Sequence, residues 1–198
     1  MKEFYGIYYE RLVGIEELML RETGAMIGSL GADSETSPAE HIKSRIKSPA
    51  SLCEKLERLG LPVSAESGLR GLSDVIGVRV VTHFIGDIYT LLALIEKNPN
   101  WRIVQIKDYI ASPKPNGYRS LHVLLALPFG VGGIDEIRAE IQLRTIAMDC
   151  WASLEHQLRY KKDIKNTALL EEELKRCADE MASTDLTMQT IRDMIRRK

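Results

Sequence analysis

One decapeptide, PKPNGYRSLH at Pro113–His122, places turn-forming residues, two cations, an aromatic ring and a histidine within ten positions. Pro115 fixes one backbone dihedral and Asn116-Gly117 readily adopts positive φ, so we expect a sharp loop that directs Tyr118 and its polar neighbours toward one point. A planar ring, cations and a histidine are groups that can bind a purine base and its phosphates. Taken alone, the segment favours the simpler interpretation of a hairpin turn that has a solvated rim.

A second cationic segment is the predicted strand His41–Lys47. The period of two of a strand places three cations on one face and two isoleucines on the other: Lys43, Arg45 and Lys47 against Ile42 and Ile46. The alternative is a basic edge strand whose charges discourage aggregation.

A helix is predicted to follow this strand directly. Ser48-Pro49 supplies an N-cap and a proline at the first helical position. Leucines at 52, 56 and 59 would then face the sheet, while Lys55 would stay near the cationic face. A helix N-terminus beside cations favours the binding of phosphate.

Two further predicted strands carry charges that need partners. The segment Asp74–Val81 is too apolar to be half exposed, so Asp74 at its mouth and Arg79 within it require partners, for which an internal salt bridge is the simplest account. In that account Gly77 only relieves packing. In the segment Arg138–Arg144, alternation sends Glu140 and Gln142 to the same side as the arginines. Asp74 and Glu140 could jointly bind a divalent cation, or Glu140 could pair with a neighbouring arginine.

Two other patterns carry weaker signals. The predicted helix after residue 145 has an apolar stripe that Glu155 interrupts, with His156 and Lys161 nearby, so these polar residues are secondary site candidates at most. The run Gly130-Val131-Gly132-Gly133 has no Lys-Ser or Lys-Thr after it, and the apolar runs on both sides favour a hairpin turn over a phosphate loop.

The composition sets limits on the class of protein. The chain has 198 residues, of which 44% are hydrophobic and 28% are charged, which suits one compact domain. Three cysteines at 53, 150 and 177 form no CxxC pair, so we expect neither a disulfide framework nor a zinc site. A net charge of −1 argues against broad binding to DNA, and no apolar run is long enough for a membrane span. We expect a soluble, untargeted cytoplasmic protein.

The order of elements predicts an α+β fold with a mixed sheet of about five strands. The strands are expected at His41–Lys47, Val75–Thr82, Trp101–Ile106, Leu121–Leu127 and Glu136–Leu143. Long terminal helices are expected at Met1 to about Ile27 and at Thr167–Arg197, with others at Ser51–Leu59, Asp87–Glu96 and Ile146–Tyr160 and a loop over Gly24–Pro38. We expect a single domain, with residues 1–38 as N-terminal helix and loop, 39–161 as core and 162–198 as helical extension.

Four blocks in this order resemble the synthetase domain of the RelA/SpoT family. They are Arg45-Ile-Lys47-Ser-Pro with Lys55; Asp74-Val-Ile-Gly-Val-Arg79-Val-Val; Lys107-Asp108-Tyr109-Ile110 with Pro113–His122; and Glu140-Ile-Gln142-Leu-Arg144-Thr145 followed by Trp151, Glu155-His156 and Tyr160-Lys161. Together they cover about residues 44 to 161. The length resembles the stand-alone small alarmone synthetases. The resemblance implies a nucleotidyltransferase-like sheet and transfer of pyrophosphate from ATP to the 3′-hydroxyl of GTP or GDP in stringent-response signalling.

The resemblance also implies roles for individual residues. On the ATP side, Arg45 and Arg79 resemble the arginines that sandwich adenine, and Lys47 and Lys55 resemble the lysines that bind the phosphates. On the acceptor side, Tyr118 resembles the tyrosine that stacks on guanine, while Lys107, Lys114, Asn116, His122 and Gln142 resemble the surrounding polar contacts. Asp74 and Glu140 resemble the Mg²⁺ ligands, and Glu140 also resembles the proposed base. Where long family members have Arg-x-Lys-Asp, this chain has Gln105-Ile106-Lys107-Asp108, so the choice between GDP and GTP stays open.

Three alternatives remain. The chain could transfer pyrophosphate to an adenosine nucleotide or to the 3′ end of tRNA, although its basic flank is limited to Arg196-Arg197-Lys198. It could be a nucleotide sensor without activity, or an oligomeric scaffold. The C-terminal helix has a heptad-like seam that consists of Leu170, Leu174, Cys177, Met181, Thr184, Met188, Ile191 and Ile195. This seam predicts either self-association or packing on the N-terminal helix. The family resemblance favours self-association as a tetramer.

Overall fold

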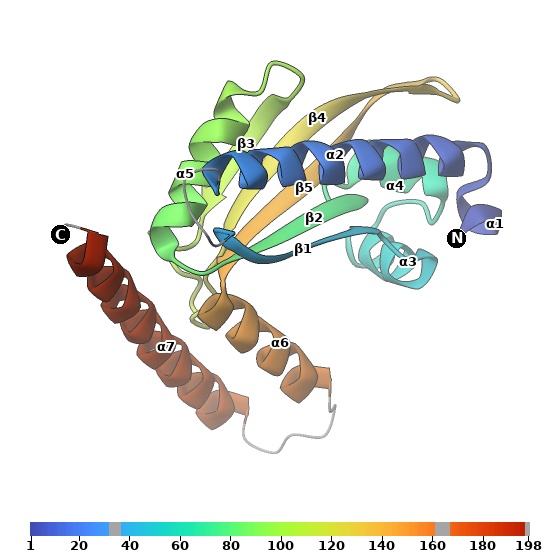
Figure 1. Cartoon of the computed structure of the whole chain (residues 1–198). Coiled ribbons are helices and arrows are strands. Elements are labelled where there is room, and N and C mark those ends of the chain that lie inside the picture. The colour runs from blue at the N-terminus through green and yellow to red at the C-terminus, as the bar shows by residue number, and fades with distance from the viewer. Residues whose placement is uncertain (32–36, 161–166, 197–198) are drawn as a thin grey trace.

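Five strands form one mixed sheet in the order β1-β2-β5-β4-β3 (Figure 1). The computed structural model describes residues 1–31, 37–160 and 167–196. The strands are β1 (Ala39–Ile46), β2 (Ile76–Thr82), β3 (Arg102–Asp108), β4 (Leu121–Val131) and β5 (Ile134–Thr145). β2 and β5 pair in parallel, and the other neighbours pair antiparallel. The predicted α+β fold with five strands is therefore confirmed.

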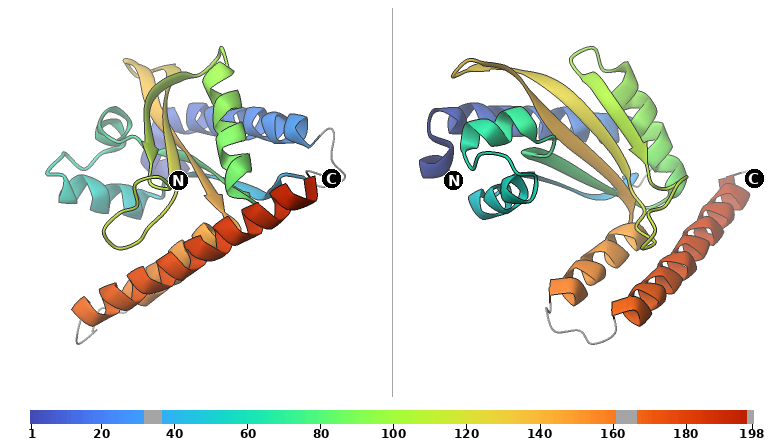
Figure 2. Two further views of the ribbon diagram at one scale, coloured as in Figure 1. Left: turned by 90° about the vertical axis from the view of Figure 1, so that its left-hand side faces the viewer. Right: turned by 180° about the vertical axis from the view of Figure 1, so that it is seen from behind.

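Helices flank the sheet and extend beyond it. They are α1 (Lys2–Tyr5), the 3₁₀ turn η1 (Gly6–Tyr8), α2 (Tyr9–Leu30), α3 (Pro49–Arg58), α4 (Ala65–Gly71), α5 (Ile85–Lys97), α6 (Ile146–Tyr160) and α7 (Thr167–Arg196). Helices α2 and α5 lie against one face of the sheet, while α6 and α7 lie side by side at the end where β5 finishes (Figure 2). Neither α2 nor α5 covers the opposite face of the sheet.

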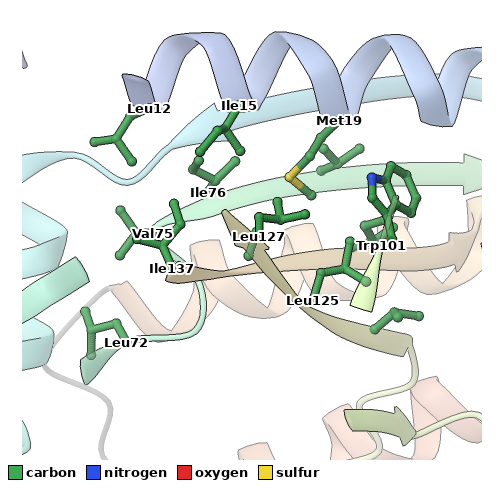
Figure 3. Packing of buried hydrophobic residues seen from close by; sticks show 14 of the residues in the cluster. Leu12, Ile15, Met19, Leu72, Val75, Ile76, Trp101, Leu125, Leu127 and Ile137 are labelled. Atoms are coloured by element: carbon green, nitrogen blue, oxygen red, sulfur yellow. The ribbon is translucent and has the colours of Figure 1, made fainter. Parts of the chain in front are cut away.

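The main core lies between the sheet and α2. Leu12, Ile15 and Met19 of α2 are at most 2% exposed, and they pack over apolar residues of β2, β4 and β5 (Figure 3). Burial of a leucine, isoleucine or methionine side chain stabilises a fold by about 1.5–3 kcal/mol. This helix therefore fixes one face of the sheet firmly.

The N-terminal helix differs from the prediction at both ends. It is interrupted at Gly6, whose φ of +52° breaks the helical path, and the main helix α2 starts at Tyr9. It continues to Leu30 through Gly24 and Gly28, where we expected a loop. The extension forms because Thr23 and Ile27 lie on the same buried side as the core residues of α2, so packing outweighs the low helix propensity of glycine.

The region around α3 agrees with the sequence pattern except at its end. The Ser48 side chain accepts a hydrogen bond from the Ser51 backbone N–H, with Pro49 at the first helical position. Leu52 and Leu56 are fully buried, but Leu59 is 53% exposed because the helix ends one residue before it. The short helix α4, which the sequence analysis did not predict, starts from a second serine cap at Ser64.

The C-terminal helices pack on each other and on α5. Trp151 of α6 donates from its indole nitrogen to the Leu174 carbonyl oxygen, and Leu174 and Ala178 complete a small buried cluster with it. Near its end, α7 contacts α5, where Arg192 pairs with Asp87. The predicted C-terminal seam is thus partly used within the chain, since Leu174 packs against α6, whereas the contact with α5 is made by Arg192, which lies outside the seam.

Two remaining predictions are settled by local geometry. Gly132-Gly133 forms the two-residue turn of the β4–β5 hairpin, with φ of +58° and +72°, so the glycine run is a hairpin as expected. In α6, Met148 and Trp151 are buried but Leu158 is 44% exposed, and Lys161 lies outside the described residues. Within the described parts of the chain, no helix is both long and apolar enough to cross a membrane.

Candidate active site

A row of polar side chains crosses all five strands on the sheet face opposite α2 and α5. The register pairs Lys43 with Arg79, Arg79 with Gln142, Gln142 with His122, and His122 with Lys107. Directly paired residues on neighbouring strands project from the same face. Strand pairing therefore brings together predicted site residues of three separate sequence blocks, with Lys43, two residues before Arg45, at the end of the row.

A cavity of about 200 Å³ lies over the β1–β2–β5 part of this face. Five predicted site residues line it, namely Arg45, Asp74, Arg79, Glu140 and Gln142. The other lining residues are Lys43, Ser44, Gly77 and Val78. A Cβ atom at Gly77 would meet nothing closer than the Glu140 carbonyl oxygen at 4.0 Å. Gly77 is thus not needed to relieve packing; it leaves room in the cavity.

Asp74 lies between two lysines at the edge of this cavity. The Lys47 Nζ is 2.8 Å from Oδ2 and the Lys55 Nζ is 2.9 Å from Oδ1, although Oδ1 accepts no hydrogen bond of good geometry. Burial raises the pKa of Asp74, but the hydrogen bonds and charges of the two lysines outweigh burial and hold the pKa below its ordinary value. Asp74 is therefore a carboxylate at neutral pH.

Glu140 accepts hydrogen bonds on both carboxylate oxygens. His122 Nδ1 lies 2.8 Å from Oε1, and Gln142 Nε2 lies 2.6 Å from Oε2. Burial raises the pKa of Glu140. The interactions with His122 and Gln142 lower this pKa by more than burial raises it, and the nearby Asp74 carboxylate acts in the same direction as burial. Glu140 is thus ionised and close enough to Asp74 for their charges to interact.

A hydrogen-bonded chain leads from Glu140 to the loop 113–120. Since the carboxylate only accepts, His122 donates from Nδ1, and its Nε2 can accept from the Tyr118 hydroxyl at 2.8 Å. The same hydroxyl accepts from Arg144 Nη2 at 2.7 Å. Each polar atom in the chain has a partner of the right kind, so the ring of Tyr118 has a fixed position.

Aromatic and cationic groups surround this tyrosine. The Lys114 Nζ lies 4.7 Å from the centre of the Tyr109 ring and 4.8 Å from that of Tyr118, within cation–π range. Tyr109 also meets the Tyr118 and His122 rings edge on. The loop predicted to bind a base therefore presents aromatic rings in edge-to-face contact, with a cation beside them, close to the carboxylate.

Asp149 of α6 joins the two sides of the site, and sequence reasoning missed it. Its Oδ1 lies 3.3 Å from Arg79 Nη1 and 3.1 Å from Arg144 Nη1. Burial and the Arg144 charge lower the pKa of Arg79, and Asp149 partly counters them. No sequence pattern pairs residue 149 with residue 79, although alternation along β5 does place Arg144 on the face of Gln142.

Four residues singled out in the sequence have positions or contacts that the sequence did not predict. Arg119, the second cation of the decapeptide, binds α7 through the Ala178 carbonyl oxygen and the Asp179 carboxylate. The Asn116 side chain accepts from the Tyr118 backbone N–H, so it shapes the loop. The cavity lining includes neither Glu155 nor His156.

The two carboxylates are the donors available to a divalent cation. Asp74 and Glu140 line one cavity, and Asp74 Oδ1, whose neighbour is the Lys55 ammonium at 2.9 Å, accepts no hydrogen bond of good geometry. Among the described residues, no group of three or more histidine, cysteine, aspartate or glutamate side chains is arranged to enclose a metal. Such a pair suits Mg²⁺, which commonly uses one or two carboxylates and completes its shell with substrate phosphates and water.

Comparison with known proteins gives concordant results. A family model described as "Region found in RelA / SpoT proteins" matches residues 44–165. The chain is 44% identical over 144 residues to the GTP pyrophosphokinase YwaC of Bacillus subtilis (strain 168), an alignment that covers 72% of this chain and 69% of that protein.

Solved structures share the whole architecture. The small alarmone synthetase 1 of Bacillus subtilis bound to its product pppGpp superposes with a TM-score of 0.81 at 28% identity, covering 93% of this chain and 94% of that one. The same synthetase bound to AMPCPP superposes with a TM-score of 0.74 at 25% identity, covering 95% of each chain. This chain belongs to the RelA/SpoT family, within the group of small alarmone synthetases.

Proposed function

We propose that this chain is an alarmone synthetase that transfers pyrophosphate from ATP to the 3′-hydroxyl of GTP or GDP, releasing AMP. The observation that carries the proposal is the cavity in which Asp74 and Glu140 lie between the cations of β1–β2 and the aromatic loop. Similar proteins support it, since one is named a GTP pyrophosphokinase and another was crystallised with pppGpp and with AMPCPP.

The reaction makes defined demands on the site. The acceptor 3′-oxygen attacks the β-phosphorus of ATP, and an O3′–Pβ bond forms. The bond between Pβ and the α,β-bridging oxygen breaks, and its electron pair stays on that oxygen, which leaves as part of AMP. Negative charge grows on the phosphoryl oxygens, so cations must be positioned around them. The 3′-hydroxyl proton passes to Glu140, whose ionised carboxylate has free lone pairs beyond its two hydrogen bonds.

The β1–β2 side is proposed to bind ATP. Arg45 and Arg79 line the cavity and would flank the adenine, and Lys47 and Lys55 would contact the phosphates. Both lysines are paired with Asp74 in this structure. ATP binding therefore exchanges internal ion pairs for phosphate contacts.

The loop side is proposed to bind the acceptor. Tyr118 would stack on guanine, with Lys114 beside it, and the polar row of Lys107, His122 and Gln142 would approach the ribose and phosphates. Asn116 would complete this side near the tip of the loop. GTP and GDP differ only at a terminal phosphate, which no described contact distinguishes.

Mg²⁺ is proposed as the cofactor, held by Asp74 and Glu140. When bound, it supplies positive charge to the phosphoryl oxygens. The donor set fits, because both groups are ionised carboxylates in one cavity, and a cation could take the place of the Lys55 ammonium at Asp74 Oδ1.

An acceptor panel tests the proposal. The purified protein, labelled ATP and Mg²⁺ are incubated with GMP, GDP, GTP, ATP or tRNA, and products are separated by chromatography. We expect label to move to GTP or GDP with stoichiometric AMP. Transfer only to ATP or tRNA would establish a different acceptor, and nucleotide binding without transfer would indicate a sensor.

We also propose that the chain is one cytoplasmic synthetase domain that self-associates through α7. Support comes from large apolar side chains that α7 leaves at least 45% exposed near its C-terminal end: Leu186, Met188, Ile191, Met194 and Ile195. Light scattering at micromolar concentration should give a mass above that of one chain, a tetramer by family resemblance. A monomer would contradict this proposal.

A further inference from the structure

Helix α7 returns to the loop 113–120 from about sixty residues later in the chain. Arg119 donates from Nη1 to the carbonyl oxygens of Gly117 and Ala178, both at 3.2 Å, and from Nη2 to Asp179 at 3.0 Å. Its side chain is only 17% exposed. One guanidinium therefore ties the loop backbone to the backbone and a side chain of α7.

Gly117 lies in direct contact with the same helix turn. Its φ is +88°, and a Cβ atom there would lie 2.6 Å from the Ala178 Cβ and 3.3 Å from the Lys175 Cα. A separation of 2.6 Å is shorter than two carbon atoms tolerate, so only glycine permits this approach. The loop and α7 are thus fitted to each other at backbone level.

Tyr118 completes the contact. Its ring packs against the cluster of Trp151, Leu174 and Ala178 that joins α6 to α7. One edge of the ring is therefore supported by α6 and α7, while its hydroxyl is held by His122 and Arg144. The position of the proposed stacking surface depends on where α7 lies.

We propose that α7 clamps the acceptor loop, and that Arg119 is a positioning residue for the acceptor nucleotide although it binds no substrate. We call Gly117, Arg119, Ala178 and Asp179 the α7 clamp. The inference rests on the proposed function in its reference to the acceptor. Releasing the clamp lowers the fraction of loops in the binding conformation, and the apparent acceptor affinity falls by the same factor.

The first test compares Arg119→Ala with Arg176→Ala, a control on α7 whose guanidinium makes only exposed ion pairs with Glu173 and Glu180. Arg119→Ala should raise the acceptor KM roughly ten- to thirtyfold, as expected for lost charge-assisted hydrogen bonds. The ATP KM and kcat at saturation should change less than threefold. Arg119→Lys keeps the positive charge but loses the planar set of guanidinium donors, so its acceptor KM should lie between those of the parent and of Arg119→Ala. The acceptor KM of Arg176→Ala should match that of the parent.

Hydrogen exchange supplies a readout that does not depend on catalysis. Without nucleotide, amides of residues 114–120 should exchange faster in Arg119→Ala than in the parent or in Arg176→Ala, while the sheet amides stay protected. This measurement also separates the two proposals. If the parent transfers no pyrophosphate, the proposed function fails, and the exchange rates of the loop still decide whether α7 clamps it.

A second pair of variants tests the backbone contact. Gly117→Ala should weaken acceptor use, because its Cβ meets Ala178 and its φ is unfavourable for alanine. Ala178→Gly removes the clashing atom and should restore part of the loss in the double variant, leaving the φ penalty. Unchanged loop exchange in Arg119→Ala, equal rises in both KM values, or no rescue of Gly117→Ala by Ala178→Gly would each overturn the clamp.

Discussion

The two halves of the site are built by different means. The donor half (Arg45, Lys47, Lys55, Asp74 and Arg79) comes from β1, β2 and the adjoining α3, and carboxylates already pair with most of its cations. The acceptor half (Lys107, Lys114, Asn116, Tyr118 and His122) centres on a loop that aromatic contacts and α7 hold in place. Charge exchange should therefore govern donor binding, and loop order should govern acceptor binding.

Glu140 lies where the halves meet, so its loss should have the largest effect. Glu140→Gln keeps the size of the side chain and removes its charge, which deletes the proposed base and a metal ligand together. We expect turnover to fall by about 10²–10⁴-fold, with nucleotide binding largely retained. Steady-state rates at saturating Mg²⁺ and nucleotides measure this change. Turnover within tenfold of the parent would show that Glu140 is only a structural partner of His122.

Tyr118→Ala should separate the halves. Base stacking on an aromatic ring is worth about 1–3 kcal/mol, so the acceptor KM should rise roughly ten- to a hundredfold while the ATP KM is spared. Arg79→Ala is the matched variant on the donor side, and it should raise the ATP KM while leaving the acceptor KM unchanged. A rise in the ATP KM alone for Tyr118→Ala would exchange our assignments of the two halves.

Acid should weaken the centre of the site. Asp74 and Glu140 have a lower pKa in the folded protein than the ordinary values of 3.8 and 4.5, so both bind protons more weakly when folded. Their stabilisation is complete above the ordinary pKa values and is lost as pH falls through the lower folded values. Urea unfolding between pH 7 and pH 3 should show this loss.

The matched variants for the acid experiment are Asp74→Asn and Glu140→Gln, each of which should flatten the dependence of stability on pH. The exposed Glu57→Gln serves as the control and should follow the parent. A parent curve no steeper than those of the two variants below pH 4.5 would contradict this account.

The smallest expected effect is at Asp185 of α7, which contacts Thr145 at the end of β5. Thr145 donates a hydrogen bond to its carboxylate, and burial raises the pKa of Asp185 more than this bond lowers it. Ionisation of Asp185 therefore costs stability once the pH rises above its ordinary pKa. Asp185→Asn keeps an acceptor oxygen without the charge and should raise the free energy of unfolding at pH 7 by about 1 kcal/mol or less. The gain should disappear in acid, and a loss of stability at pH 7 would refute this interpretation.

Sequence periodicity predicted the donor half well. Alternation placed Arg45 and Glu140 on the correct faces, because a strand has a fixed period and its register follows from burial of the other face. The partners of Asp74, which are Lys47 and Lys55, come from the adjoining end of β1 and from α3. Local patterns therefore contained most of the information needed.

For the acceptor half, the sequence predicted which residues take part but not which distant residues hold them in place. The sequence marked Tyr118 and His122, yet it gave Arg119 a ligand-binding role because Asp179 lies sixty residues away with no pattern to connect them. Asp149 was missed for the same reason, since only the fold brings α6 beside Arg79. The error in predicting the end of α2 also has a tertiary cause, because packing of Ile27 extends this helix across glycines that favour a loop.

The parallel pairing of β2 with β5 has a consequence for how the protein folds. It joins Gly77 to Glu140, about sixty residues apart, whereas the β4–β5 hairpin closes over two residues. Distant pairings form more slowly because a long segment must be ordered before any contact rewards it. Glu140 and Asp74 therefore meet late, and during refolding we expect hairpin structure to return before activity does.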